Sequence, residues 1–187
     1  MRLAIDTSSA RSAVAVLEGP KVIAEVVKPS GRDFEVAAEV ARLLPDPKAL
    51  DSVLVALGPG SFTGLRQGIA FGVGLALALG VPLLGIGTLE LAAARARQAA
   101  LAVSDAGRGR VYWLAPDGRR GVDEAASLPT EWKAVGWLRQ PPAEVDFLPE
   151  PALRTFGEAV LAVEGKAQKV DYATVRPQYM EDFGRLV

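Results

Sequence analysis

The chain has 187 residues, half of them hydrophobic and 23% charged, and its net charge is −1. It contains neither Cys nor His, which excludes disulfides, thiolate catalysis, His-based triads and zinc sites built on His or Cys. The lack of a basic excess argues against strong binding to nucleic acid by the chain alone.

The first half of the chain is predicted to alternate between strands and helices. The predicted strands are residues 2–5, 12–17, 22–27, 52–57 and 83–86. The predicted helices are residues 33–44, 64–79 and 89–101, the last with Arg95 and Arg97 facing outward. Short turns make the first three strands an antiparallel meander, and the helical crossovers place the later strands parallel to one another.

This order of elements is that of the ribonuclease-H-like unit, which also occurs in the actin and sugar-kinase (ASKHA) superfamily. We therefore predict an α/β fold with a mixed sheet and helices on its faces, in a subdomain of residues 1–100. Residues 101–187 are predicted to form a smaller, degenerate second subdomain. It begins with a hairpin of residues 103–106 and 111–114, followed by a strand at 132–138 and a helix at 156–163.

The turn of residues 58–66 (GPGSFTGLR) joins a predicted buried strand to a predicted buried helix. Ser61 or Thr63 can cap that helix, and the unpaired N–H groups at its start could hold a phosphate or carboxylate. The alternative is a well-built turn with no ligand.

Asp6 and Thr7 follow the first strand, where actin-like proteins carry a phosphate loop. They could form an anion or nucleotide site with Ser61 and Thr63, or simply a hydrogen-bonded turn. The strand at 52–57 ends without an acidic residue, so the two-metal site of a nuclease is not predicted, and no metal or catalytic residue is assigned.

The helix at 64–79 has Gly or Ala at every fourth position and is apolar on nearly all sides. Because each internal glycine costs roughly 1 kcal/mol relative to alanine, the stripe needs a packing reason. Either the chain covers this helix by itself, or part of its surface meets another subunit. The residues predicted to form such an interface are Phe34, Ala38, Ala41, Leu65, Gly68, Ile69, Gly72 and Ala76.

Four arginines surround the predicted hairpin of the second half, namely Arg108, Arg110, Arg119 and Arg120. Tyr112 and Trp113 lie between them. Basic residues beside aromatic ones can contact RNA, and the alternative is a solvated turn.

Residues 67–89 carry no charge, yet Gly80-Val81-Pro82 interrupts the run after about four turns of helix. A membrane-spanning helix needs about 20 continuous residues. We therefore expect a soluble, cytoplasmic protein.

Several segments resemble the bacterial TsaB family of tRNA threonylcarbamoyladenosine biosynthesis proteins. They are residues 3–8 (LAIDTS), residues 58–66, residues 82–90 (PLLGIGTLE), and Asp105-Ala106 followed by Val111-Tyr112. The segment Asp33-Phe34-Glu35 departs from the family's usual start of the first helix, as does Gly107-Arg108-Gly109-Arg110 after Asp105-Ala106.

The resemblance implies an actin-like fold without catalytic activity of its own. It also implies a TsaD-like catalytic paralogue as partner, a TsaE-like ATPase that joins the pair, and a homodimer when the chain is alone, with pairing through the first two helices. ATP and metal are expected in the partner subunits, no cofactor is expected in the isolated chain, and tRNA is met only through the complex. Two rival hypotheses remain, an actin-like ATPase or phosphotransferase that uses Asp6 and the 58–66 turn, and a peptidase, which would lack His and Cys.

Overall fold

The computed structural model describes residues 1–31 and 34–178. Its first sheet has six strands in the order β10-β5-β4-β1-β2-β3. The strands are β1 (Arg2–Asp6), β2 (Arg11–Glu18), β3 (Lys21–Pro29), β4 (Ser52–Ala56), β5 (Leu83–Ile86) and β10 (Gln168–Lys169). β1, β2 and β3 form the predicted meander, and β1, β4 and β5 are parallel. The predicted mixed sheet is confirmed.

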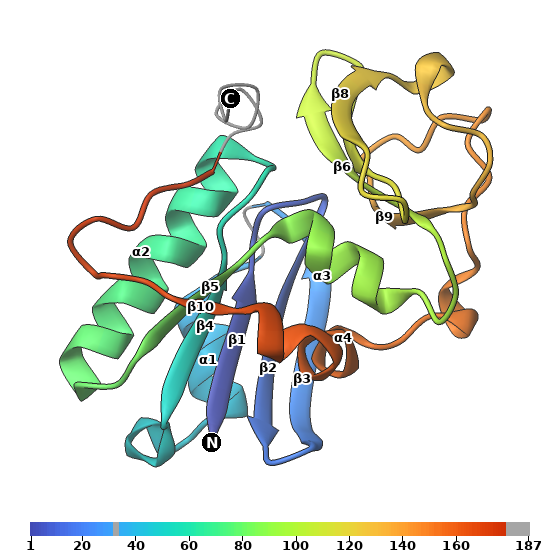
Figure 1. Ribbon diagram of the computed structural model, residues 1–187. Helices are drawn as coiled ribbons and strands as arrows, with labels where there is room; N and C mark the ends of the chain where they lie inside the picture. The colour runs from blue at the N-terminus through green and yellow to red at the C-terminus, as the bar shows by residue number, and fades with distance from the viewer. Residues whose placement is uncertain (32–33, 179–187) are drawn as a thin grey trace.

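Alternation of side chains along β1 and β4 gives this sheet two apolar faces. Leu3, Ile5, Val53 and Val55 face one core, which is covered by α1 (Val36–Leu43) and α2 (Phe62–Leu79). Ala4 and Leu54 face the other core, which is covered by α4 (Phe156–Val163) and the end of α3 (Thr88–Arg95). Figure 1 shows α2 on one side of the sheet and α3 and α4 on the other. Small residues on β2, Ala13 and Ala15, lie in the core that α4 covers.

The second sheet has four strands in the order β8-β7-β6-β9. They are β6 (Leu101–Gly107), β7 (Arg110–Leu114), β8 (Arg120–Glu124) and β9 (Ala134–Trp137). The predicted hairpin is confirmed as β6–β7, whose register pairs Gly107 with Arg110. β8 was not predicted. One face of this sheet packs on α3, which therefore lies between the two sheets.

The third predicted helix is too long. It ends at Arg95 instead of residue 101, and Leu101 already belongs to β6. The alanine-rich stretch favours helix, but the backbone carbonyls of Ala94 and Ala96 accept hydrogen bonds from the Arg154 guanidinium. This tertiary contact ends the helix and turns the chain into the second sheet.

Residues after the second sheet return to the first one. The segment Phe156–Val163 forms α4, as predicted, and β10 pairs with the edge of β5. The backbone N–H of Gln178 donates to the Leu57 carbonyl at the end of β4. The division at residue 100 stays a prediction, and residues 179–187 of its second part lie outside the described residues, as does the predicted helix start at Asp33.

Candidate functional site

The turn of residues 58–66 is bound to the loop that follows β1. The Ser61 N–H donates to the Ser8 carbonyl (2.6 Å), and the Thr7 hydroxyl donates to the Gly64 carbonyl (2.6 Å). The Ser61 hydroxyl accepts from the Gly64 N–H, which confirms that Ser61 caps α2. These bonds hold the N-terminus of α2 against the end of β1.

Glycine is required at two positions of this junction. A Cβ at Gly60 would overlap the Ser8 carbonyl oxygen, and a Cβ at Gly64 would overlap the Thr7 carbonyl oxygen. The glycines therefore permit two stretches of backbone to approach each other. The hydroxyls of Thr7 and Ser61 form hydrogen bonds within the junction, and Thr63 is exposed. These contacts favour the well-built turn over an anion site.

The third segment of the resemblance joins the same junction through Thr88. Its N–H donates to the Gly58 carbonyl (2.8 Å) and its hydroxyl donates to the Ser8 hydroxyl (2.9 Å). Segments from three distant parts of the sequence are thus connected by hydrogen bonds at the carboxyl ends of β1, β4 and β5.

Asp6 lies beneath this junction, and only 4% of its surface is exposed. Its Oδ1 accepts hydrogen bonds from the Ser8 N–H (2.8 Å) and the Ser8 hydroxyl (2.5 Å). Burial raises the pKa of the Asp6 carboxyl, against these two hydrogen bonds, which lower it. The Asp6 carboxyl thus serves as a hydrogen-bond acceptor that fixes Ser8 in the loop after β1.

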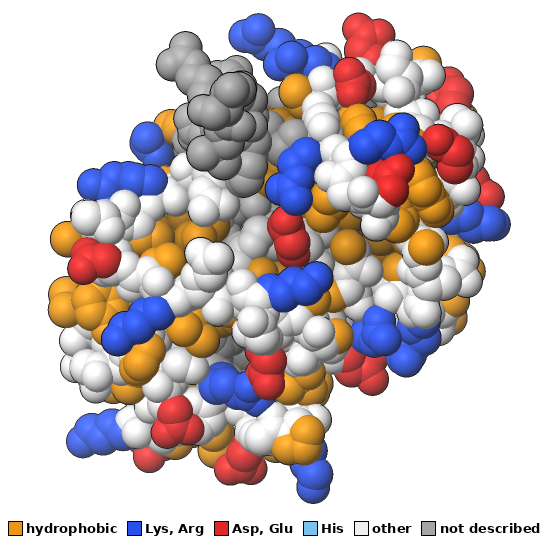
Figure 2. Space-filling view, in the orientation of Figure 1, with side chains coloured by type: hydrophobic (Ala, Val, Ile, Leu, Met, Phe, Trp, Pro, Cys, Tyr) orange, Lys and Arg blue, Asp and Glu red, His pale blue; other side chains and the backbone are white. Residues whose placement is uncertain are grey.

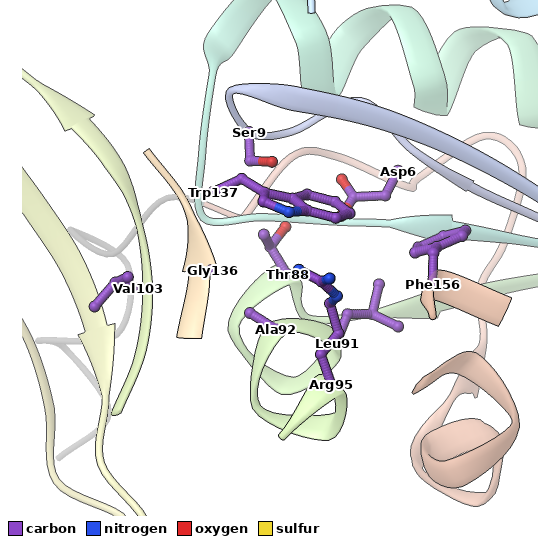
Figure 3. Close-up of a pocket in the computed structure, with 10 residues that line it drawn as sticks. All are labelled: Asp6, Ser9, Thr88, Leu91, Ala92, Arg95, Val103, Gly136, Trp137 and Phe156. Atoms are coloured by element: carbon purple, nitrogen blue, oxygen red, sulfur yellow. The ribbon is translucent and has the colours of Figure 1, made fainter. Parts of the chain in front are cut away.

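The cavity beside Asp6 is about 20 Å³, which is room for roughly one water molecule. Figure 3 shows why it is small: the Trp137 ring extends between Asp6 and Ser9 on one side and Thr88 and Arg95 on the other. An adenine nucleotide does not fit in this space. The rival hypothesis of an ATPase that uses Asp6 would need the two sheets to move apart.

Trp137 is held in place by Arg95 and Glu150. The Arg95 guanidinium lies 4.4 Å from the centre of the indole, and it pairs with the Glu150 carboxylate (2.5 Å). The indole N–H donates to the same carboxylate (3.1 Å). Burial raises the pKa of Glu150, but the Arg95 and Trp137 contacts lower it by more, so the net shift is downward.

The prediction that Arg95 faces outward is wrong, since it is 6% exposed. Its position in the last turn of α3 points it between the sheets, where its guanidinium contacts Trp137 and Glu150 while its Nε has no hydrogen-bond partner among the described residues. No local sequence pattern predicts that residues 95, 137 and 150 meet, because each comes from a different element. Only the Trp at the end of a predicted strand could have indicated the contact.

The glycine stripe of α2 faces this chain's own sheet. A Cβ at Gly68 would overlap the Thr7 hydroxyl, and a Cβ at Gly72 would overlap a methyl of Val55. The buried members of the predicted interface are Phe34, Leu65, Gly68, Ile69, Gly72 and Ala76. Their assignment to a partner surface is therefore corrected: the packing reason for the stripe is internal. Ala38 and Ala41 on α1 are exposed.

The opposite side of α2 is uncovered within the described chain. We call the exposed residues Phe62, Arg66, Ala70, Gly74, Leu77 and Ala78 the outer face of α2. Phe62 is 52% exposed and Leu77 is 61% exposed, and they are two of the three large hydrophobic residues that are most exposed among those described. Arg66 is its one charged residue, and its guanidinium lies 3.8 Å from the centre of the Phe62 ring. Figure 2 shows hydrophobic side chains at the surface on the side where α2 lies.

By length and composition alone, α2 is one helix that could cross a membrane. The same test is passed by core helices of soluble proteins. Here α2 packs its glycine stripe on β1 and β4, and the chain re-enters the sheet directly after it. These contacts favour a helix of a globular domain.

Among residues 1–31 and 34–178, no group of three or more His, Asp or Glu side chains is arranged to hold a metal ion. Several of the described acidic residues form ion pairs instead. One of them is Glu39 on α1, which pairs with Lys28 and Arg42.

The chain is similar to known proteins named for tRNA threonylcarbamoyladenosine formation. The family model of TsaD, described as tRNA N6-adenosine threonylcarbamoyltransferase, matches residues 37–129. The chain is 39% identical over 119 residues to the tRNA threonylcarbamoyladenosine biosynthesis protein TsaB of Bacillus subtilis, across 59% of this chain and 52% of that one. It is 33% identical over 122 residues to the TsaB protein of Buchnera aphidicola, across 59% of this chain and 58% of that one.

The matched region thus spans somewhat more than half the length of these curated relatives. Among solved structures, YeaZ from Pseudomonas aeruginosa superposes with a TM-score of 0.72 at 24% identity, across 95% of this chain and 98% of that one. This superposition confirms the predicted ASKHA-type fold. The chain is thus similar to TsaB proteins in sequence and in fold, and the motifs that carry this similarity meet at the ends of β1, β4 and β5.

Proposed function

We propose that this protein is a non-catalytic subunit in the formation of threonylcarbamoyladenosine in tRNA, and that it pairs with a TsaD-like paralogue. The relatives reported above are named for this biosynthesis. The observation that carries the proposal is the outer face of α2, an apolar surface that the described chain leaves open.

This surface has the character of a subunit interface. A helix that is apolar on all sides must be covered on all sides, and the sheet covers only the glycine stripe. Two aromatic or large aliphatic side chains stand out from it, Phe62 and Leu77, with Arg66 between them along the helix. Aromatic residues and arginine, here Phe62 and Arg66, are enriched at interfaces. Ala38 and Ala41 on α1, which contacts α2, are also exposed.

The proposal assigns the chemistry to other subunits. The chain contains no His, and the cavity at Asp6 has room for about one water. In this proposal ATP and metal are bound by the TsaD-like paralogue and a TsaE-like ATPase, in the cytoplasm, and this chain orders the paralogue's site by covering part of its surface. When no paralogue is present, the same outer face pairs two copies of this chain.

Co-purification with the TsaD-like paralogue of the same organism tests the proposal. Ala70→Glu and Leu77→Glu place a charge on the outer face of α2 and should abolish co-purification. Ile23→Glu is the matched control, because Ile23 is 50% exposed and lies on β3, away from α2. If both α2 variants still co-purify, this face is not the interface.

Calorimetry with ATP and magnesium separates the proposal from the ATPase hypothesis. The chain alone should show no stoichiometric binding and no turnover. Tight binding with turnover by the chain alone would overturn the non-catalytic assignment.

A further inference from the structure

We infer that the open cleft between the start of α2 and the β6–β7 hairpin is a contact site for the phosphate backbone of RNA. The cleft is about 680 Å³ and is lined from three parts of the chain, namely residues 60–62, 105–112 and 138–142. Figure 1 shows the end of the second sheet that carries this hairpin on the same side of the molecule as the start of α2.

Three arginines line this cleft: Arg108 and Arg110 in the hairpin, and Arg139 after β9. All three are exposed, and none forms an ion pair with a carboxylate of the described residues. The one acidic residue in the lining is Asp105, which accepts a hydrogen bond from the Arg139 backbone N–H (3.1 Å). The lining therefore carries a net positive charge in a chain whose net charge is −1.

The other two arginines near this hairpin form ion pairs within the chain. The arginines that line the cleft therefore differ from the remaining basic residues of the hairpin. Arg119 pairs with Asp117 and Glu131, and Arg120 pairs with Glu90. The four arginines of the sequence pattern thus separate into a paired set and an unpaired set. Only the unpaired set faces the cleft.

The backbone of Arg108, in the hairpin turn, has a conformation that is unfavourable for arginine. Arg108 has φ of 54° and is followed by Gly109 at 75°, so both central residues of the turn are left-handed. Glycine and asparagine favour this conformation, and arginine does not. It is the one non-glycine residue with positive φ in the described chain, and such outliers concentrate at functional positions.

The shape and the aromatic lining favour a polymer over a small anion. The three arginines lie along the second-sheet side of an open cleft, opposite residues 60–62, and such a row of charges suits a charged strand that passes through the cleft. Phe62 and Tyr112 line the same cleft and add aromatic surface to it. The choice of tRNA as that strand rests on the proposed function, while the charge of the cleft does not.

The test is the affinity of the full chain for a fluorescent tRNA transcript, measured by anisotropy from 50 to 200 mM salt. The test variant is Arg108→Gln/Arg110→Gln/Arg139→Gln. The control is Lys21→Gln/Lys48→Gln/Lys169→Gln, which removes the same charge from exposed positions outside the cleft. Loss of three phosphate contacts should make the slope of log affinity against log salt shallower by about 2–3. Between 50 and 200 mM salt, the fall in affinity of the arginine variant should therefore be smaller than that of the wild type by a factor of roughly 16–64.

Equal salt slopes for the arginine variant and the lysine control would overturn the inference, as would a wild-type chain that does not bind the transcript at 50 mM salt. Displacement of the tRNA by 1 mM ATP or inorganic phosphate would also overturn it, in favour of a small-anion site. Because the chain is measured alone, a failed co-purification with the paralogue would count against the proposed function and leave this result standing.

Discussion

The Thr7 carbonyl oxygen occupies the space in which a side chain at Gly64 would have to lie. Gly64→Ala should therefore force the β1–β2 loop away from α2 and cost about 1–3 kcal/mol, as overpacking does. The matched control is Gly74→Ala in the same helix, where a Cβ meets nothing within 4 Å. That variant should be more stable than the wild type by roughly 0.5–1 kcal/mol, because alanine favours helix.

Urea unfolding checks both variants, at several protein concentrations so that any self-association is separated from folding. Equal destabilisation by the two substitutions would contradict the carbonyl contact as the reason for glycine at residue 64.

The outer face of α2 should pair copies of the isolated chain. Leu77→Glu should make the protein monomeric at concentrations where the wild type is a dimer in sedimentation velocity. Because Leu77 is 61% exposed, its replacement should change the free energy of unfolding by only about 0.5 kcal/mol. Ile23→Glu should remain dimeric, and a monomeric wild type at all concentrations would contradict self-pairing.

Trp137 should contribute strongly to the packing of the second sheet against the first. Trp137→Ala removes the ring that fills the space beside Asp6 and the cation–π contact with Arg95, and should cost about 2–3 kcal/mol for this partly buried side chain. Trp137→Phe keeps a ring but loses the hydrogen bond to Glu150, and should cost about 1 kcal/mol. Urea midpoints test the order, and an alanine variant as stable as the phenylalanine variant would contradict it.

Asp6 should make the protein less stable as pH rises. Its folded pKa lies above the ordinary value of 3.8, so above pH 4 the unfolded chain loses the proton first and folding becomes less favourable up to the folded pKa. Asp6→Asn keeps an oxygen that can accept from Ser8 and cannot ionise. The stability of this variant relative to wild type should increase between pH 4.5 and pH 7.5.

Thermal unfolding over this pH range provides the measurement. A difference in stability between the two proteins that is the same at every pH would mean that ionisation of Asp6 does not affect folding. Co-purification of Asp6→Asn with the paralogue should be retained, since the residue shapes a loop inside the chain.

The first sheet could be predicted because its strands are marked by alternation or by continuous apolar runs with turn residues between them. The strands 12–17, 52–57 and 83–86 were placed within one residue at each end. β8 could not be predicted, since Arg120–Glu124 is polar and gains its strand from pairing with β7. β10 has two residues, which is too short for any local pattern.

The glycine stripe shows a different limit. Its spacing predicted close packing on one face of α2, and that face is indeed closely packed. The spacing does not say which neighbour supplies the contact. A sheet with a bulky Val55 and a hydroxyl at Thr7 requires small residues just as another helix would.

β10 covers the edge of β5, although it has only two residues. Gln168 and Lys169 pair with Gly85 and Leu84, and the Val170 N–H donates to the Leu83 carbonyl. A chain cut before residue 168 would keep every buried strand but leave the margin of β5 open to strands from other molecules. Shortening from that end should therefore be seen first as precipitation, in a protein whose remaining core is still native.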